Sequence, residues 1–502
     1  MIATVLSASL LGVDGHRVVV EVHIGNGLPA FTVVGLPDAA CREARDRVRA
    51  AFASSGLEFP KRKVTVNLAP SGVRKVGSGL DVPIAVAILA AQGRVDAHRV
   101  SGCAFFGELG LDGALRPVPG MLSLVDAAGA TAAVVPFRSA PEAALIEGTL
   151  VRGLSTLTEL VAALDGSQPW PESPTPGSAR PDPPVGDLAD VRGQPLGVWA
   201  LEVSAAGGHH LLMIGPPGAG KTLLASRLPT ILPPLTRAEA IEVARIHSAG
   251  GLALSGNGLV EQPPFRAPHH TASMASLVGG GTAWIRPGEV SYAHNGVLFM
   301  DELAEFPPSV LDTLRQPLEE ATIRVSRARH TVVFPARFLL VAAMNPCPCG
   351  PTGGVCECGE AVRSRYSRRI SGPLLDRFDL RVVISRPDVT ELLDRTGGES
   401  SAAVADRVAA ARAAAAERGV RCNAELPASE LDRTAVLGRG ARALVEHRLR
   451  SGRLSARGLH RVQRVARTLA DLAGDDHAVV DEGHVAAALE LRADTAVLAA
   501  AS

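Results

Sequence analysis

The chain has 502 residues, more than a single hydrophobic core usually supports, so two or three domains are expected. Apolar residues make up 46% of the chain and charged residues 20%, which is the composition of a soluble globular protein. Because 51 cationic and 51 anionic side chains cancel, the chain as a whole does not attract nucleic acid, and such a partner would need a local basic surface.

The N-terminal segment has no cationic residue before its apolar stretch, so it does not resemble a signal peptide. The longest apolar runs, such as Val82–Ala91, have the length of core segments and are too short to span a bilayer. We therefore expect a cytoplasmic protein without a membrane partner. Its seven cysteines should be reduced in that compartment.

Residues 1–165 predict an α/β domain, because β-rich segments alternate with segments of helical periodicity. The expected strands are 16–24, 31–34 and 63–68, and the expected helices are 38–54, 81–91 and 122–128. A linker follows at 166–186, where a third of the positions are proline, a residue excluded from helix and sheet interiors.

Residues 187–388 predict a second α/β domain. Short apolar runs at 210–214, 296–300 and 337–343 are typical of the buried strands of a parallel sheet. The composition then shifts to Ala, Arg and Leu, and apolar side chains recur at helical spacing within 455–472. We expect a helical lid subdomain over 389–502.

The segment GPPGAGKT follows the run at 210–214 and precedes a helical pattern, which is the context of a phosphate-binding loop. Its glycines let backbone N–H groups face phosphate oxygens, its lysine adds a cation, and its threonine hydroxyl can bind Mg²⁺. The alternative, a chance Gly/Pro turn, is disfavoured by the fit of all eight residues. The predicted nucleotide-binding residues are Gly215, Pro216, Pro217, Gly218, Ala219, Gly220, Lys221 and Thr222.

Two further strand ends predict the rest of the ATP site. Asp301 and Glu302 follow an apolar strand, so Asp301 can hold Mg²⁺ together with Thr222 while Glu302 polarises the attacking water. Asn345 follows the next strand and could orient that water. Taken alone, the acidic pair is explained by a strand end that meets solvent. Asn345, taken alone, could be a turn residue before Pro346.

Four cysteines, Cys347, Cys349, Cys356 and Cys358, lie in one glycine-rich loop. Four thiolates on such a loop suit tetrahedral Zn²⁺, although the C-x-C spacing differs from the commoner C-x₂₋₄-C. Spectator thiols and a redox pair are the alternatives.

Six stretches of the second part carry a recognisable pattern: FRAPHHTASMASLVGGG, PGEVSYAHNGVLFMDELAEF, LRQPLEE, AAMNPCPCG, SGPLLDRFDL and LSARGLHRVQRVARTLADL. Together they resemble the magnesium-chelatase-like AAA+ family, specifically the YifB/ComM branch. The resemblance implies a homo-hexameric ring that hydrolyses ATP between its subunits.

The same resemblance implies roles for three polar residues. Asn345 corresponds to the first sensor. Arg377 corresponds to the arginine given to the neighbouring subunit's γ-phosphate, with Arg368 and Arg369 as nearby substitutes. Arg457 corresponds to the second sensor from the lid. Each arginine, taken alone, could equally be a solvated surface residue.

Two insertions are expected on the same basis. One, Phe265–Tyr292, carries His269 and His270, for which structural hydrogen bonding is favoured over metal binding. The other, Ala321–Pro335, predicts two short strands. In related ring helicases such insertions line the pore, so Arg327, Arg329 and His330 are candidate contacts to DNA phosphates. A surface hairpin with solvated arginines is nearly as good an explanation.

In the first domain, VNLAPSGVRKVGSGLDVPIAVAIL and FFGELGLDGALRPVPGM resemble the Lon-protease-like domain, whose fold is ribosomal S5-like. A Lon-type protease needs a serine and a lysine base. Here Ser78 is out of register, and Met121 and Leu122 stand where the lysine should fall. Lys75, the only substitute, is better explained as a phosphate- or surface-contacting cation. We expect a proteolytically inactive domain used for assembly or substrate binding.

The predicted function is a DNA-acting ATPase, a hexameric helicase or branch-migration motor in recombination or natural transformation. Its cofactors would be ATP, Mg²⁺ and Zn²⁺, and its substrate single-stranded or branched DNA. Two other functions remain open: a metal-chelatase motor subunit, and an ATP-dependent peptidase or protein-remodelling machine.

Overall fold

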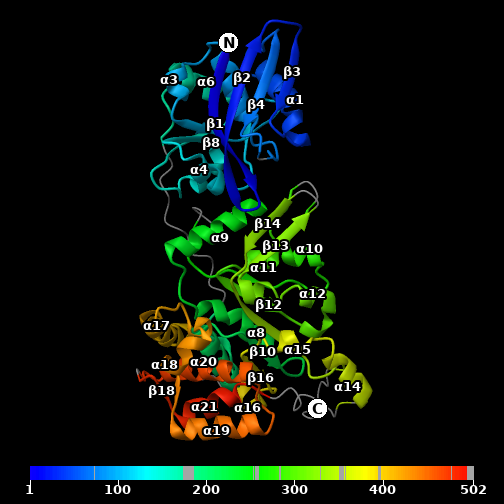
Figure 1. Ribbon diagram of the computed structural model, residues 1–502, viewed down its shortest axis with the longest axis vertical. Helices are drawn as coiled ribbons and strands as arrows, with labels where there is room; N and C mark the ends of the chain where they lie inside the picture. Colours follow the sequence, from blue (N-terminus) through cyan, green and yellow to red (C-terminus); the bar gives the residue numbers. More distant parts are fainter. Residues whose placement is uncertain are drawn as a thin grey trace.

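The structure of the chain is a computed structural model. It describes residues 1–493 apart from 73, 173–185, 253, 255–258, 282–283, 328–329, 350–355, 357, 394–396 and 476. Figure 1 shows an elongated molecule with an N-terminal α/β domain at one end and a helical lid at the other. Within the described residues, no helix combines the length and the apolar character that crossing a membrane requires.

The N-terminal domain is built on a mixed sheet. Its strands are β1 (Ile2–Leu11), β2 (Asp14–Gly25), β3 (Ala30–Val34), β4 (Lys63–Ala69), β5 (Cys103–Phe105), β8 (Ala132–Pro136) and β9 (Leu150–Leu154), with a separate pair β6 (Glu108–Leu109) and β7 (Leu115–Arg116). Its helices are α1 (Ala39–Ser54), α2 (Asp81–Ala91), α3 (Ala97–Val100), α4 (Met121–Ala128), α5 (Ala140–Ala143) and α6 (Leu157–Asp165). In the sheet, the described strands lie in the order β3-β4-β2-β1-β5-β8-β9.

The three strands and three helices expected in this domain are all present, within two residues at each end. The sequence patterns did not predict β1, because most of this strand is buried on both faces and shows no simple alternation of polar and apolar residues. Val5 packs with α1 and α2, whereas Ala8 and Leu10 belong to a second core that includes α4. The domain therefore has helices on both faces of its sheet.

The second part contains a parallel sheet of β10 (Leu211–Ile214), β11 (Phe265–Arg266), β12 (Gly296–Met300), β15 (Phe338–Met344) and β16 (Leu380–Val383). The order is β11-β12-β15-β10-β16. Its helices are α7 (Pro195–Gly207), α8 (Lys221–Arg227), α9 (Arg237–Gly250), α10 (Met274–Val278), α11 (Glu289–Tyr292), α12 (Pro308–Asp312), α13 (Pro317–Glu320), α14 (Glu360–Ser367) and α15 (Gly372–Leu375). The predicted P-loop sheet is confirmed, and this is an AAA+ core.

The C-terminal part is helical, as predicted. It consists of α16 (Val389–Leu393), α17 (Ser401–Glu417), α18 (Ala428–Thr434), α19 (Arg439–Arg450), α20 (Ala456–Leu472) and α21 (Glu482–Glu490), with β17 (Val436–Leu437) pairing β18 (Val479–Val480). Both α17 and α20 pack against α7 of the core. Asp379, just before β16, joins α20 to the core through an ion pair with Arg461.

The structure agrees fully with one of the two predicted insertions and only partly with the other. Residues 321–335 form the predicted hairpin of β13 (Thr322–Arg327) and β14 (His330–Pro335), in antiparallel register. The segment 265–292 is an insertion only in part, because its first two residues form β11 and pair with β12 at the edge of the core sheet. An edge strand of two residues is too short for periodicity to identify.

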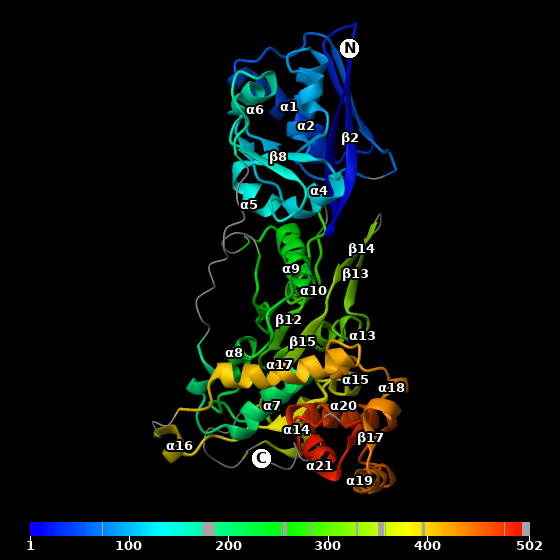
Figure 2. The same cartoon turned by 90° about the vertical axis from the view of Figure 1, so that its left-hand side faces the viewer.

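The N-terminal domain rests on α9 and on the β13–β14 hairpin, as Figures 1 and 2 both show. Helix α4 packs on α9, and the Gly120 N–H donates to the Ser248 carbonyl oxygen at 3.1 Å. Glu142 accepts hydrogen bonds from the Leu122 N–H and the Ser248 hydroxyl, and its burial raises the pKa of the carboxyl group. At the β1–β2 turn, Gly12 lies directly against the Val332 side chain.

Candidate functional site

The predicted phosphate loop lies where β10 ends and α8 begins, at the carboxyl edge of the sheet. The N–H of Gly215 donates to the carbonyl oxygen of Met344 at 3.1 Å, which ties the start of the loop to the end of β15. Gly218 and Gly220 have φ values of 77° and 83°, and a side chain added at either would meet open space. The loop is therefore a cradle of backbone N–H groups at a helix N-terminus.

Lys221 lies folded back into this cradle with 8% of its surface exposed. Its Nζ donates to the carbonyl oxygens of Gly215 and Pro216, at 2.6 and 3.0 Å, and to Asn345 Oδ1 at 3.1 Å. Burial lowers the pKa of Lys221, and the nearby carboxylates of Asp301 and Glu302 oppose that shift. The structure thus joins two predicted residues, Lys221 and Asn345, from different strand ends.

The acidic pair completes the same edge. The Thr222 hydroxyl donates to Asp301 Oδ2 at 2.8 Å, so the two predicted Mg²⁺ ligands are in contact. Glu302 adopts a left-handed backbone conformation with φ 52°, and its N–H donates to Asp301 Oδ1 at 2.9 Å. The carboxylate of Glu302 points to the insertion, where its Oε2 lies 3.0 Å from His270 Nδ1.

One residue that holds the loop was not predicted. Gln194, just before α7, is buried and its Nε2 donates to the carbonyl oxygens of Ala219 and Ser385, at 2.9 and 2.7 Å. It therefore joins the phosphate loop to the segment after β16. Its position before a proline at the start of α7 marks a helix N-terminus, but only the fold brings it to the loop.

The residues of this edge fit a nucleoside triphosphate with Mg²⁺. The cradle left open by Gly218 and Gly220 presents N–H donors for phosphate oxygens, and Lys221 has carbonyl and amide partners that a phosphate can replace. Thr222 and Asp301 supply hard oxygen ligands that would hold Mg²⁺, which would help to neutralise the phosphate charge.

The predicted arginines lie elsewhere. Arg377 precedes β16, whose start pairs with the start of β10, so it lies at the amino edge of the sheet. Its guanidinium pairs with the Glu319 carboxylate. Burial lowers the pKa of Arg377, and so do the neighbouring guanidinium groups of Arg461, Arg457 and Arg315. Arg457 is thus close to Arg377. The four-residue strand β10, about 13 Å long, separates these arginines from the phosphate loop.

Arg368 and Arg369 are less suited than Arg377 to the role of an arginine that reaches a neighbouring subunit's γ-phosphate. Arg369 forms an ion pair with Glu305 at 3.0 Å, and Arg368 is the exposed last residue of the α14 turn.

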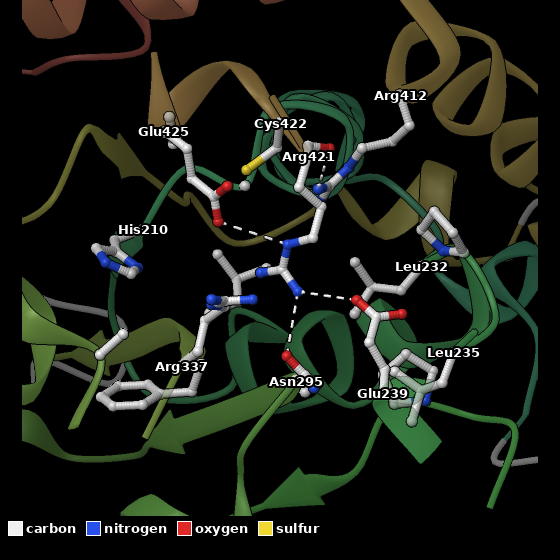
Figure 3. A pocket seen from close by; sticks show the side chains of 18 of the residues that line it. His210, Leu232, Leu235, Glu239, Asn295, Arg337, Arg412, Arg421, Cys422 and Glu425 are labelled. Carbon is white, nitrogen blue, oxygen red and sulfur yellow. Dashed lines mark hydrogen bonds and ion pairs between the residues drawn. The ribbon is translucent and has the colours of Figure 1, made fainter. Parts of the chain in front are cut away.

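A cavity of about 660 Å³ also opens at the amino edge, between the sheet and the lid (Figure 3). Arg421 crosses it, donating from Nη1 to Glu239 Oε1 and Asn295 Oδ1, each at 3.2 Å, while its Nε lies 3.5 Å from Glu425 Oε1. Glu319, the partner of Arg377, lines the same cavity. Among the described lining residues none belongs to the phosphate loop, so this cavity is separate from the triphosphate cradle.

The candidate DNA residues lie at the end of the β13–β14 hairpin. Arg327 and His330 are the last paired residues of the two strands, whereas Arg329 lies outside the described residues. Hydrogen bonding accounts for His269, whose Nδ1 is 2.9 Å from the Thr271 hydroxyl, in agreement with the sequence.

The Lon-like domain does not assemble a serine–lysine pair. The Ser78 hydroxyl donates to the Glu108 carboxylate, and Lys75 Nζ donates to the Pro70 carbonyl oxygen. The interpretation of Lys75 as a phosphate- or surface-contacting cation is wrong, because its exposed fraction is 0%. Met121 and Leu122 are fully buried in the apolar core, in place of a base.

The four clustered cysteines converge although several residues separate them. Their sulfur atoms all lie within 4.8 Å of one another. The distances from Cys347 Sγ to Cys349 Sγ and Cys356 Sγ are 3.2 and 3.4 Å, and the distance from Cys349 Sγ to Cys356 Sγ is 3.7 Å. Sulfur atoms bound to one tetrahedral zinc ion at about 2.3 Å are about 3.8 Å apart, so the set fits such an ion closely.

Comparisons with known proteins agree with this geometry. Residues 187–392 match the family described as magnesium chelatase, subunit ChlI; residues 20–139 match subunit ChlI of Mg-chelatase, and residues 398–492 match the C-terminal part of subunit ChlI. The chain is 44% identical to the uncharacterised protein YifB of Escherichia coli and 43% identical to the competence protein ComM of Haemophilus influenzae, each time over 98% of this chain and 97% of the relative. A partial match, 28% identical over 28% of this chain and 27% of the relative, is Lon protease 2 of Bacillus subtilis.

The geometry of the phosphate loop predicts that two variants will differ in nucleotide binding and in hydrolysis. Lys221→Ala should lose nucleotide affinity and lower turnover by at least about 100-fold, because the triphosphate then lacks its cation. Glu302→Gln should bind the nucleotide normally and fail to hydrolyse it. Fluorescent-nucleotide titration and a phosphate-release assay measure both quantities. Lys61→Ala, at an exposed lysine, is the control. Turnover by Lys221→Ala at the parent rate would contradict this assignment.

Proposed function

Because this chain belongs to the YifB/ComM branch of the magnesium-chelatase-like AAA+ family, we propose that it is a ring-forming ATPase that moves along DNA as a helicase or branch-migration motor. The observation that carries the proposal is the position of two half-sites at opposite edges of one sheet. The triphosphate cradle is at the carboxyl edge, and the cluster of Arg377 and Arg457 is at the amino edge.

The hydrolytic step is assigned to the carboxyl edge. Lys221 and the loop N–H groups hold the phosphates, and Thr222 and Asp301 hold Mg²⁺. Glu302 accepts a proton from the attacking water as it adds to the γ-phosphorus, and the bond to the β-phosphate oxygen breaks to release ADP and phosphate. Asn345, now hydrogen-bonded to Lys221, orients that water.

The amino edge explains why a ring is needed. Arg377 and Arg457 cannot reach the cradle of their own chain, because the sheet separates them from it. Burial and the neighbouring guanidinium groups lower the pKa of Arg377, and such a group of cations favours a polyanion. In a head-to-tail ring this edge would face the neighbour's triphosphate. The proposed number of six subunits in the ring rests on the family resemblance.

Two considerations support DNA as the substrate. The relative ComM is named a competence protein, which suggests involvement with DNA. The strands β13 and β14 end at the pair Arg327 and His330, and the sequence from Arg327 to His330, which includes Arg329, supplies basic residues suited to phosphate contacts. We propose that ATP cycling moves this hairpin along single-stranded or branched DNA during recombination or transformation.

A second candidate is a metal-chelatase motor subunit, because the matched families are described by that activity. In this case the same ATP cycle would drive Mg²⁺ into a tetrapyrrole, and the hairpin would contact a partner protein. The response of ATP turnover to DNA separates the two candidates.

The N-terminal domain is proposed to be proteolytically inactive and to serve assembly or substrate binding. We propose that the chain has four parts: the N-terminal domain at 1–165, the linker at 166–186, the core at 187–388 and the lid at 389–502. The support is the hydrogen bonding of Ser78 to Glu108 and the burial of Met121 and Leu122 where a lysine base would stand.

The cysteine cluster is proposed to bind one structural Zn²⁺ through Cys347, Cys349, Cys356 and Cys358. The described cysteines form no disulfide, and these four sulfur atoms lie within 4.8 Å of one another, close to the separations in a tetrahedral site. Cys347 lies two residues after Asn345. Zinc would therefore brace the strand end that carries the first sensor.

The test of the motor function uses the purified chain with and without forked DNA. We expect DNA to stimulate ATP turnover at least about fivefold, and the stimulation to weaken as salt rises. The Arg327→Ala/Arg329→Ala variant should lose most of this stimulation. Arg324→Ala, which changes an exposed arginine nearer the hairpin base, should keep it. Absence of both DNA binding and stimulation in the parent would favour the chelatase instead.

The shared site predicts complementation between two inactive variants. Lys221→Ala keeps the arginines and Arg377→Ala keeps the cradle, so each alone should be inactive. A random mixture should recover about a quarter of the parent turnover, because a site needs one subunit of each kind. The same result is expected with Arg457→Ala in place of Arg377→Ala.

The control replaces Lys221→Ala by a Lys221→Ala/Arg377→Ala double variant, which should rescue nothing. Full activity of Arg377→Ala alone, or rescue by the double variant, would contradict catalysis between subunits.

The zinc site predicts about one zinc ion per chain by elemental analysis. Cys349→Ser, which changes the exposed member of the set, should lose the ion and lower the thermal unfolding midpoint. Cys103→Ser lies outside the cluster and should keep it. Failure of the parent protein to bind zinc after reduction and incubation with the metal would rule the site out.

A further inference from the structure

The lid segment 433–470 carries a large excess of positive charge. It contains ten arginines and a single acidic residue, Glu446, although the charges of the whole chain cancel. Part of this excess is compensated inside the protein, because Arg461 and Arg467 form ion pairs with carboxylates. The rest lies on helix α19 and on the turn that follows it, where the side chains reach solvent.

The arginines of α19 line the side of the helix that faces solvent. Arg442 and Arg450 follow Arg439 by three and eleven residues, close to one and three full turns, so the three side chains share one side. All three are exposed, and for Arg450 the exposed fraction of the side chain is 82%. Ala441 and Val445 are buried on the opposite side, where α19 packs against α21.

Helix stability does not explain this arrangement. Arg450 is near the C-terminus of α19, where a cation suits the helix dipole, and it pairs with a glutamate one turn earlier at 3.2 Å. Arg439 and Arg442 instead lie in the first turn, where a positive charge opposes the dipole. Glu482 comes close to Gly440, yet within the described residues neither of these arginines forms an ion pair. An external anion would account for them.

The chemistry of this face favours a particular anion. Protein–protein interfaces are built around apolar and aromatic side chains, whereas the exposed residues of α19 are only Arg, Ala, Glu and His. Single-stranded nucleic acid is held by stacking on aromatic rings, and residues 434–473 include no Phe, Trp or Tyr. Positive charge without apolar or stacking groups suits the phosphate backbone of a duplex, whose bases are already stacked.

The dimensions and the position of α19 agree with such a partner. Arg439 and Arg450 are about 16 Å apart along the helix axis. Because duplex DNA carries one charge per about 1.7 Å of its axis, this length of duplex presents about ten phosphates. Exposed Arg453 extends the basic face beyond the helix. Figures 1 and 2 show α19 at the end of the molecule opposite the N-terminal domain, whereas the β13–β14 hairpin lies toward that domain.

We propose that the lid face of Arg439, Arg442, Arg450 and Arg453 is a second DNA site, which binds the phosphate backbone of duplex DNA without reading its sequence. The hairpin would contact the single-stranded or branched part, and the lid face would hold a duplex arm. The inference rests on the proposed action on DNA and adds the place of a second contact and the form of DNA that it binds.

The test measures the fluorescence anisotropy of a labelled blunt duplex and of a labelled single strand of equal length. Arg439→Gln/Arg442→Gln/Arg450→Gln should weaken duplex binding at least about tenfold. The slope of log affinity against log salt should become shallower by about 2.7, since each lost phosphate contact contributes about 0.9. Affinity for the single strand should change less than about threefold, because that strand is assigned to the hairpin.

Two control variants carry the same number of changes. Lysine at the same three positions should restore duplex affinity, because a backbone contact needs a cation and not a guanidinium fork. Arg62→Gln/Arg94→Gln/Arg138→Gln removes three exposed arginines of the N-terminal domain and should bind both DNAs as the parent does. The lid variant with glutamine should unfold at no lower temperature than the parent, since Arg439 and Arg442 oppose the helix dipole.

The possible outcomes separate this site from the motor function. Equal duplex affinity of the parent and the glutamine lid variant would overturn the site and leave the motor function standing, as would a parent that binds only the single strand. Loss of the oligomer in sedimentation, together with weaker binding of both DNAs, would assign the arginines to a second copy of the chain and overturn the site. Duplex binding that this variant loses, without any stimulation of ATP turnover by DNA, would support the site and refute the motor. A parent that binds neither DNA would refute both.

Discussion

Two hydrogen bonds join the segments that follow β10, β12 and β15 at the carboxyl edge of the core sheet. Thr222 donates to Asp301, and Lys221 donates to Asn345, so the phosphate loop after β10 is joined to the ends of β12 and β15. All three strands are parallel, and their carboxyl ends therefore meet at one edge. The reactive groups come from residues far apart in the chain, and the sheet alone brings them together.

The parallel sheet also separates the phosphate loop from Arg377 and Arg457. A residue before a strand and a residue after it lie at opposite edges, so Arg377 and Asn345 face different surfaces of one subunit. The guanidinium of Arg377 lies beside those of Arg461, Arg457 and Arg315, and the carboxylates of Glu319 and Asp379 compensate part of this positive charge.

The two insertions contact other parts of the chain. His270 Nδ1 lies 3.0 Å from Glu302 Oε2, and the β13–β14 hairpin touches the N-terminal domain where Val332 lies against Gly12. The N-terminal domain, in which Lys75 is buried, thus contacts the core both at this hairpin and at α9.

The sequence alone determined the fold class, the nucleotide loop, the acidic pair and the helical lid, because local spacing and strand–loop–helix context encode them directly. The helix 81–91 and the strand 296–300 were predicted to the residue, since each is a continuous apolar segment with a clear end. Only the tertiary structure decided that Gln194 braces the loop, that Lys75 is buried, that Phe265 begins an edge strand and that Arg457 lies beside Arg377. These facts depend on contacts between segments distant in the chain, and no local pattern of residues records which distant segment will become a neighbour.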